Sequence, residues 1–473
     1  VFEDFFDANL ITQTDSDSYK FTIATEQVNA IRWLTSGKKA LQLGTFGGNF
    51  SASSGTTNVP ITPTNIVVQR DTTYGAANIL PVRIGNFVYY IQRNLKVMRE
   101  LGFEFDIDDN RANEMTLLSD QILGASGAKQ MAYQQAPGNI LWVVRADGEV
   151  ATLTRQQEQE IIGWSRQKFG GTFQTSKAVC ESVAVIPGLT GDDQVWVIVK
   201  RTINSVTRRY VEFIMPQTFD DLDDSFFVDS GLSLDSAKTI TGATVANPVV
   251  LTANGHGFSN GDQVKIVDVI GMTELNDKFY LVSDKAANTF KLTDTDGNNI
   301  DGSAFTAYVI GGEVRLMVSS VSGLDHLEGE TVAILGDGAV QPQKVVASGA
   351  VTLSVKAAKV HIGLPYTPEI NGLPLTDGSA TGTGRGKERK IYIMDIILVN
   401  TLGAQIGRGS TFDTVLFRKT TDPLDQPPPI FSGTKQVGFP AGWDTIGQYI
   451  IKQPQPLPIT VIGAVLRSDV QDK

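Results

Sequence analysis

The runs Ile140-Leu-Trp-Val-Val144 and Val150-Ala-Thr-Leu153, with Ala146-Asp-Gly148 between them, decide the fold class. Two runs of β-branched and aromatic residues around an Asp-Gly turn form the pattern of a β-hairpin. Runs of the same kind recur along the chain, for example Phe87-Val-Tyr-Tyr-Ile91 and Gln194-Val-Trp-Val-Ile-Val199. The sequence therefore predicts a protein built mainly of β-strands.

Helical periodicity is weak, and we expect only short helices, within residues 26–34, 110–123 and 155–162. In the first 215 residues, strand–turn–strand segments each carry an aromatic residue near the same place. These residues are Trp33, Tyr89, Trp142, Trp164 and Trp196. Their intervals are irregular, but the average interval is close to the roughly 40–50-residue period of propeller blades. The spacing indicates a β-propeller-like domain over residues 1–215, with a β-sandwich as the alternative.

Composition and charge limit the function classes. The chain has 473 residues, including 46 glycines and 19 prolines, which suits a turn-rich protein with ordinary cores. A formal charge of −11 disfavours tight binding to nucleic acid, because that binding requires a basic surface that neutralises phosphates. The longest apolar run, residues 391–399, is far shorter than the roughly 20 residues of a transmembrane helix, so no membrane-spanning segment is expected. The chain starts at Val1 rather than at methionine, so we expect further sequence upstream.

The residue composition of the sequence changes at Pro216. An acidic stretch follows, and after it comes a module of short strands and turns over residues 238–317, which we predict to be an inserted small β-barrel. Alternating patterns then resume, so residues 216–237 and 318–473 are expected to form a further β-domain. A Gly/Ser/Thr-rich segment, residues 371–390, is expected to be a mobile arm or a long hairpin tip. The acidic stretch contains Asp220, Asp221, Asp223 and Asp224.

No group of residues has the pattern of a catalytic, cofactor-binding or metal site. Thr383-Gly-Arg-Gly-Lys387 lacks the first glycine and the final hydroxyl of a P-loop. The segment Asp294-Thr-Asp-Gly-Asn-Asn-Ile-Asp301 lacks the glycine and glutamate of an EF-hand and is the pattern of a hairpin turn. The single cysteine, Cys180, and His256 are expected to be structural. We therefore predict a protein that is not an enzyme and that holds no cofactor or metal.

The four aspartates could in principle supply the paired carboxylates of a glycoside hydrolase. Those carboxyl groups must stand roughly 5 to 9.5 Å apart across a sugar, and neighbouring aspartates in one loop seldom satisfy that geometry. A solvated acidic linker is the simpler interpretation.

Eight short sequence segments, called strings below, occur along the chain in an order that resembles one protein family. They are Asp17-Ser-Tyr-Lys-Phe-Thr-Ile-Ala-Thr-Glu-Gln-Val-Asn-Ala-Ile-Arg-Trp33, Leu43-Gly-Thr-Phe-Gly-Gly48, Leu80-Pro-Val-Arg-Ile-Gly85, Ala132-Tyr-Gln-Gln135, Glu181-Ser-Val-Ala-Val-Ile-Pro-Gly188, Phe226-Phe-Val-Asp-Ser-Gly-Leu232, Gly323-Leu-Asp-His-Leu-Glu-Gly329 and Gly363-Leu-Pro-Tyr366. Together they resemble the tail nozzle, or tail tubular protein B, of short-tailed bacteriophages. The resemblance covers nearly the whole chain except the module at 238–317.

The module resembles a different family. Gly255-His-Gly-Phe-Ser-Asn-Gly-Asp262, Phe305-Thr-Ala-Tyr308 and Gly311-Gly312 are similar to the small β-barrel in the first catalytic-cysteine half-domain of ubiquitin-activating enzymes. The large catalytic domains of those enzymes are absent from this sequence, so the resemblance does not imply ubiquitin chemistry.

The nozzle resemblance implies a β-propeller-like domain and a β-rich tube domain, assembled as a homo-oligomeric ring, commonly a hexamer. It implies tail adaptor proteins above the ring, tail fibres or spikes at its side, and transient passage of genomic DNA. The expected location is the distal virion tail, with assembly in the host cytoplasm. Asp220, Asp221, Asp223 and Asp224 are then candidates for an acidic lumen that does not retain phosphates. A carbohydrate-binding or depolymerising tail protein is the alternative function.

Overall fold

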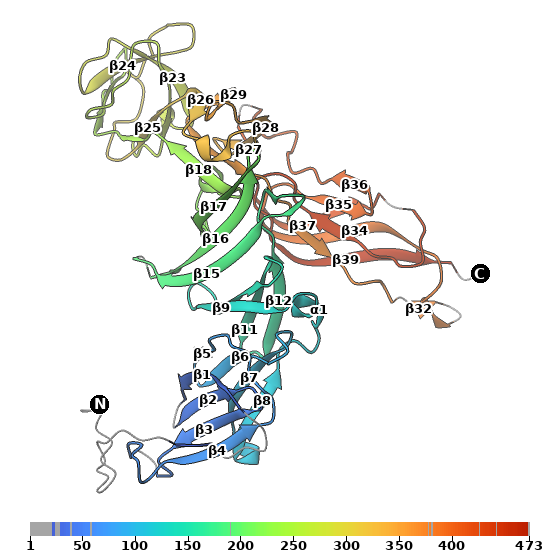
Figure 1. Ribbon diagram of the computed structural model, residues 1–473. Coiled ribbons are helices and arrows are strands. Elements are labelled where there is room, and N and C mark those ends of the chain that lie inside the picture. Colours follow the sequence, from blue (N-terminus) through green and yellow to red (C-terminus); the bar gives the residue numbers. More distant parts are fainter. Residues whose placement is uncertain are drawn as a thin grey trace. The chain divides into compact units, whose positions relative to one another are not determined.

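The regular secondary structure of the computed structural model is almost entirely β-strand, which confirms the predicted mainly-β fold class (Figure 1). The structure describes residues 21–23, 29–37, 40–56, 59–189, 191–376, 378–379, 382–424, 426–440 and 442–471. Among these residues the single α-helix is α1 (Gln121–Gly124), and no helix is long and apolar enough to span a bilayer. The chain forms two compact units. The first comprises residues up to 214 except 202–207, and the second comprises 202–207 and the residues from 215 onward.

The first unit contains three four-stranded antiparallel sheets in succession, and in each the strands follow one another in chain order. They are β1 (Ile31–Ser36), β2 (Leu41–Thr45), β3 (Asn49–Ser53) and β4 (Val67–Thr72); β5 (Val82–Ile84), β6 (Phe87–Ile91), β7 (Met98–Glu104) and β8 (Asp109–Glu114); and β9 (Ala128–Gln134), β10 (Ile140–Arg145), β11 (Val150–Gln156) and β12 (Ile161–Gln167). A short hairpin of β13 (Thr172–Phe173) and β14 (Ser176–Lys177) leads to a three-stranded sheet of β15 (Val179–Pro187), β16 (Asp193–Ile203) and β17 (Val206–Phe213). A four-stranded meander is the unit of a propeller blade.

Consecutive sheets of this unit pack against each other through apolar cores. Trp33 of β1 lies against Tyr90 of β6, with ring centroids 5.7 Å apart. Tyr89, on the opposite side of β6, belongs to a second core that the sheet β5–β8 shares with the sheet β9–β12. Trp142 of β10 packs with the strands β15 and β16 in a third core. Three of the aromatic residues marked by sequence spacing therefore connect one sheet to the next.

Two of the three predicted short helices are wrong in their described residues, and the third is confirmed only at residues 121–123. Residues 31–34 belong to β1, residues 110–114 belong to β8, and residues 155–156 and 161–162 belong to β11 and β12. Only α1 is helical within 110–123. Burial alternates in these segments, as at Trp33 between the exposed Arg32 and Leu34. A weak helical pattern was overridden because each segment completes a sheet that its neighbouring hairpin begins.

The second unit contains several smaller antiparallel sheets around one main core. One sheet has the order β18 (Asp229–Asp235), β30 (Lys359–Leu364), β27 (Thr331–Gly336) and β28 (Ala339–Val345), and β26 (Val318–Ser322) pairs with β29 (Ala350–Ala357). Another has the order β31 (Glu369–Asn371), β38 (Ile450–Lys452), β35 (Gln405–Arg408) and β36 (Thr411–Thr414), and β32 (Gly378–Ser379) pairs with β33 (Gly382–Thr383). The long strand β34 (Arg389–Thr401) lies between β37 (Phe431–Gly438) and β39 (Val461–Val470). Met394, Ile396 and Leu398 of β34 are fully buried in the core.

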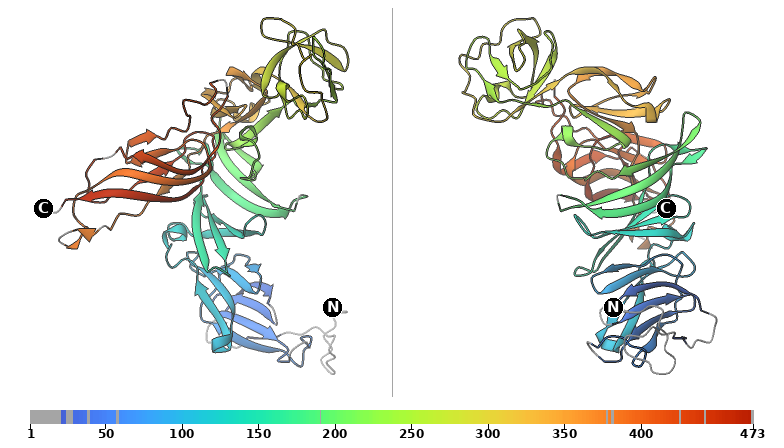
Figure 2. Two further views of the ribbon diagram at one scale, coloured as in Figure 1. Left: turned by 180° about the vertical axis from the view of Figure 1, so that it is seen from behind. Right: turned by 60° about the vertical axis from the view of Figure 1, so that its left-hand side comes forward.

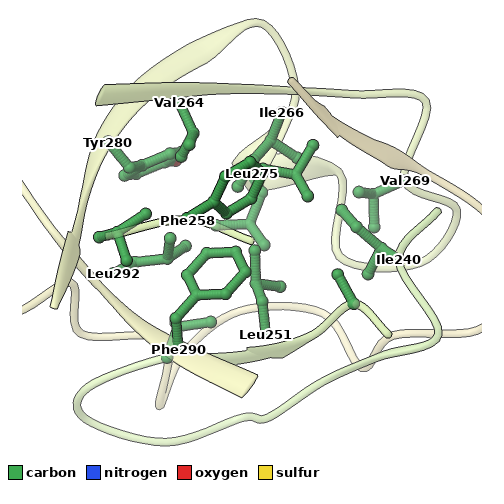
Figure 3. Close-up of a cluster of buried hydrophobic side chains, with 14 of the residues drawn as sticks. Ile240, Leu251, Phe258, Val264, Ile266, Val269, Leu275, Tyr280, Phe290 and Leu292 are labelled. Atoms are coloured by element: carbon green, nitrogen blue, oxygen red, sulfur yellow. The ribbon is translucent and has the colours of Figure 1, made fainter. Parts of the chain in front are cut away.

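Within this unit, residues 238–316 form a sheet of seven strands with a core of their own. The order is β19 (Lys238–Thr239), β25 (Glu313–Leu316), β22 (Gln263–Val267), β23 (Lys278–Ser283), β24 (Thr289–Thr293), β21 (Val250–Thr252) and β20 (Gly242–Ala243). In both views of Figure 2 these strands curve around one interior. Figure 3 shows Phe258, Phe290 and Leu251 pointing into that interior, and every member of the core lies between Ile240 and Leu316. The first strand, β19, pairs with the last, β25, so the chain enters and leaves this module at adjacent positions.

Candidate functional site

The acidic stretch forms a single 3₁₀ turn, Leu222–Asp224, immediately before strand β18. Carboxylate oxygens of Asp221, Asp223 and Asp224 lie within 4.8 Å of one another, whereas Asp220 is exposed and outside this group. Burial raises the pKa of Asp221, and the neighbouring negative charges of Asp223, Asp268, Asp224 and Asp220 raise it further. The structure thus brings three of the four predicted residues together.

Two cations lie against this turn, and each is almost fully buried. Arg315 of β25 is 7% exposed and contacts Asp223 at 3.3 Å, Asp235 at 3.4 Å and Glu313 at 2.8 Å. Lys359 of β30 is 8% exposed and pairs with Asp224, and its Nζ lies 3.9 Å from Asp235. A buried cation is strongly destabilising unless anions surround it. The acidic residues therefore compensate two buried positive charges, and Asp235 is shared between them.

His361 holds the backbone of the same turn. Its Nε2–H donates to the carbonyl oxygen of Asp223 at 2.8 Å, and its Nδ1 accepts a hydrogen bond from the Ser233 hydroxyl at 2.7 Å. Because a carbonyl can only accept, the neutral imidazole carries its proton on Nε2. Burial lowers the pKa of His361, and the hydrogen bond to Asp223 partly offsets that shift. The ring also packs edge-on against Phe226, with centroids 5.4 Å apart.

This ion-pair network connects the inserted module to the β-domain that carries it. Arg315 and Glu313 come from the last strand of the module, whereas Asp223, Asp224 and Lys359 come from the surrounding domain. A divalent cation bound to the three carboxylates would have to displace Arg315 and Lys359. The geometry therefore fits a set of ion pairs between the module and the surrounding domain better than a metal site.

Sequence reasoning missed the cations and the histidine of this network. Arg315 is 92 residues from Asp223, and Lys359 is 135 residues from Asp224. No local pattern marks such pairs, because they meet only after two sheets have formed. The interpretation of the acidic stretch as a solvated linker is thus wrong for Asp223, which is largely buried and paired with Arg315, whereas Asp224 is exposed and pairs with Lys359.

The other residues singled out from the sequence have structural roles. Imidazole atoms of buried His256 contact the carbonyl of Ala286 at 3.0 Å and the amide of Phe258 at 3.0 Å. Cys180 is buried in an apolar core, and burial raises the pKa of its thiol to about 11. The Asp294 carboxylate caps the turn by accepting from the amides of Asp296 and Asn298, which confirms the predicted hairpin turn.

The resemblance of Thr383–Lys387 to a phosphate loop also finds a structural explanation. The guanidinium of Arg389 is buried and donates to the carbonyl oxygens of Leu375 and Gly384. The groups that contact this guanidinium are therefore backbone carbonyl oxygens. A phosphate would instead need backbone amides. Its strands β32 and β33 pair at Gly378–Thr383, as expected of a hairpin tip. Residues 377, 380 and 381 of the predicted arm lie outside the described residues.

Comparisons with known proteins support the resemblance of the module. Residues 247–317 match the ubiquitin-activating enzyme E1 FCCH domain family, within the segment for which that likeness was predicted. No curated protein matches the chain.

Two similar solved structures are variants of the exo-β-1,3-galactanase from Phanerochaete chrysosporium with β-1,3-galactotriose. They align with 82% of this chain and with 95% and 94% of their own, at 9% and 8% identity and TM-scores of 0.19 and 0.18. Scores of this size carry no argument about fold or function.

Proposed function

We propose that this chain is a structural, non-catalytic component of a bacteriophage tail, of the tail nozzle or tube kind. It would form a ring-shaped channel for DNA ejection and a platform for tail fibres. The ring would be a homo-oligomer at the distal end of the virion tail, in contact with adaptor proteins above it.

The observation that supports this proposal is that three of the strings that resemble the tail nozzle family contact one another in the structure. The string at 226–232 pairs with that at 363–366 through β18 and β30, where Asp229 faces Leu364. The imidazole Nε2 of His326, in the string at 323–329, contacts the carbonyl oxygen of Ser230 at 2.9 Å. These strings are far apart in sequence and lie on both sides of the inserted module. The three strings therefore meet in one part of the fold. This common location supports a family resemblance over a chance match.

Two glycines, Gly231 and Gly363, allow the first two of these strings to approach each other closely. A Cβ atom on Gly363 would lie 2.6 Å from the Cα of Gly231 and 2.7 Å from the carbonyl oxygen of Asp229. Separations this short involve backbone atoms, which cannot move aside as a flexible side chain can. The close pairing of β18 and β30 therefore depends on glycine.

The sheet of β37, β34 and β39 offers a surface for a neighbouring copy. One side of it packs on the core, and Val465 lies on the other side, where it pairs with Asp395; Ile462, which is 66% exposed, and Tyr392 are exposed at the two register shifts between β34 and β39. Exposed apolar residues on a sheet face are characteristic of association surfaces. A polar pair, Arg467 with Asp395 at 3.1 Å, lies among them and would give the contact orientation.

Electron micrographs of the purified chain test this proposal. We expect rings with a central hole, and we expect Ile462→Asp to abolish them while leaving the fold intact. Val245→Asp, on the inserted module, is the matched control because Val245 is also exposed. A chain that stays monomeric at high concentration would contradict the proposal. Purified protein that degrades host polysaccharide would favour the carbohydrate-active alternative instead.

A further inference from the structure

An open cleft of about 360 Å³ lies in the first unit, where β4 leaves its sheet and passes β8 of the next. Its lining includes Arg70, Asp71, Thr72, Tyr74, Asn110 and Arg111. The volume is at the lower end of the range for small-molecule sites, which is roughly 300–1,000 Å³. None of these residues takes part in the ion-pair network or in the surfaces proposed for assembly.

The carboxyl group of Asp71 forms one side of the cleft and is only half satisfied. Its Oδ1 accepts hydrogen bonds from the Ser51 hydroxyl at 2.9 Å and from the Asn110 amide nitrogen at 2.9 Å. Its Oδ2 is buried and has no hydrogen-bond partner among the described residues. Burial raises the pKa of this carboxyl group, and the two hydrogen bonds partly offset the rise. Buried polar atoms are nearly always paired, but this oxygen is closed to the cleft, so only the remaining surface of the Asp71 side chain is open to a ligand.

Further unpaired polar atoms lie behind Thr72. The amide nitrogen of Asn49 donates to the Thr72 hydroxyl at 3.3 Å, but the Asn49 Oδ1 and the Tyr90 hydroxyl are buried without a partner in the described structure. Burial raises the pKa of Tyr90 to about 12, and the nearby side chains of Thr72 and Asn49 reduce that rise without making a well-formed hydrogen bond. Such a set of donors and acceptors is what ordered water occupies. These buried groups lie behind the lining residues of the cleft and do not contact a ligand there.

The rim of the cleft carries a fixed aromatic ring. The guanidinium carbon of Arg99 lies 3.5 Å from the centroid of the Tyr74 ring. Arg99 is itself held by the Ala112 carbonyl at 3.0 Å and by the Gln92 amide oxygen at 2.9 Å. Tyr74 is nevertheless 41% exposed, so its free surface is the face and edge away from Arg99. This arrangement gives a flat, immobile apolar platform beside the polar groups.

The charges around the cleft balance. Arg111 pairs with Glu104 at 3.1 Å, and the exposed Arg70 faces a site that contains the Asp71 carboxyl group. An anion would gain attraction from the arginines but would be repelled by the two carboxylates. A neutral ligand meets no such penalty, and it can accept from guanidinium groups while donating to a carboxylate.

We propose that this cleft binds a neutral saccharide, one or two hexose units at a time. Sugar hydroxyl groups both donate and accept, which matches the arginines, Asn110 and Asp71, and the apolar C–H face of the ring fits the platform of Tyr74. This inference is independent of the proposed tail function, because a ring can form whether or not the cleft binds sugar.

Saturation-transfer difference NMR on the full chain tests the inference, with isomaltotriose, cellotriose and N-acetylchitotriose as neutral probes. We expect saturation of at least one of them at millimolar concentration. Tyr74→Leu removes the flat platform and should weaken binding about tenfold, as should Arg70→Gln, which removes a donor.

Matched variants separate a local effect from a general one. Trp443→Leu changes another exposed aromatic residue, 48% against 41% for Tyr74, that belongs to the second unit, and Arg166→Gln changes an arginine that, like Arg70, is exposed and contacts one carbonyl. Both should leave binding unchanged. No transfer to any probe would overturn the proposal, as would binding that Tyr74→Leu and Arg70→Gln leave intact. Inorganic sulfate retained by Arg70 in the absence of sugar binding would identify an anion site and would also overturn it.

Discussion

His361 is the titratable residue whose environment most directly links pH to stability. It is neutral and buried between the hydroxyl of Ser233 and the backbone of Asp223. Burial lowers its pKa below the ordinary value of 6.5, so the folded protein resists a proton that the unfolded chain accepts. The stability contributed by the neutral ring is therefore present above that value and is lost as the pH falls through the lowered pKa.

We predict that acidification from about pH 7 to about pH 5 lowers the protection factors of backbone amides in β18 and β30, that is, the ratio of the intrinsic exchange rate at each pH to the observed rate. Mass spectrometry of peptides from these strands measures the effect. In His361→Gln the dependence on pH should be much weaker, since the titrating group is absent. Ser233→Ala is the control, because it removes a hydrogen bond to the ring and leaves the titration in place. Equal pH dependence in the wild type and His361→Gln would contradict this assignment.

Gly363 is the residue at which a single methyl group should be most costly. Its Cβ would collide with backbone atoms of Gly231 and Asp229, so β18 and β30 would have to separate. We expect Gly363→Ala to lower the free energy of unfolding by about 1–3 kcal/mol, the usual range for overpacking. Gly438→Ala is the matched control, because nothing lies within 4 Å of its added Cβ and its backbone conformation is ordinary. Denaturant titration compares the two, and equal losses would show that the close approach is not what matters.

At the scale of elements, local signals predicted strands well and helices poorly. Strand β6 has the bounds of the run Phe87–Ile91, and the Ala146–Gly148 turn joins β10 to β11. The apolar residues 415–417 follow β36 without forming a strand, although Val415 and Phe417 are buried in the core. Apolar residues show that a segment is buried, but pairing with a neighbour decides whether it becomes a strand. The ion pairs of the candidate site could not be predicted, since their partners come from distant strands.

The inserted module is the element whose removal should be best tolerated. Its core draws on no residue outside 240–316, and its contacts with the surrounding domain include the ion pairs of Arg315 and the pair between Lys265 and Asp337 at 3.8 Å. We expect a variant without residues 238–317 to unfold cooperatively and to assemble. Its melting temperature should be slightly lower than that of the full chain, because Asp223 and Asp235 lose a cation.

Differential scanning calorimetry and micrographs of this deletion variant give the comparison. Arg315→Gln in the full chain serves as the control, since it removes the same cation while the module stays in place. Loss of all cooperative unfolding after deletion would mean that the module is part of the core of the domain.

At the scale of the whole molecule, the chain carries a net charge of −11, which would oppose the approach of DNA. Carboxylates repel phosphates, and salt screens that repulsion only partly at physiological ionic strength. We predict no measurable binding of a short labelled duplex by the assembled protein, in fluorescence anisotropy at physiological salt. Nanomolar binding that weakens steeply with added salt would contradict a channel in which DNA moves freely.

The pairing of Lys238 with Val314 makes this chain a natural acceptor for foreign sequences. Adjacent antiparallel strands lie about 5 Å apart, so any folded unit whose two ends are that close can be joined at the same two peptide bonds. A fluorescent reporter, an antibody fragment or a sugar-binding domain could be exchanged for the module without lengthening the path of the host backbone. The surrounding domain would then hold the new unit at the same position, and the binding specificity of the inserted unit could be changed without redesigning that domain.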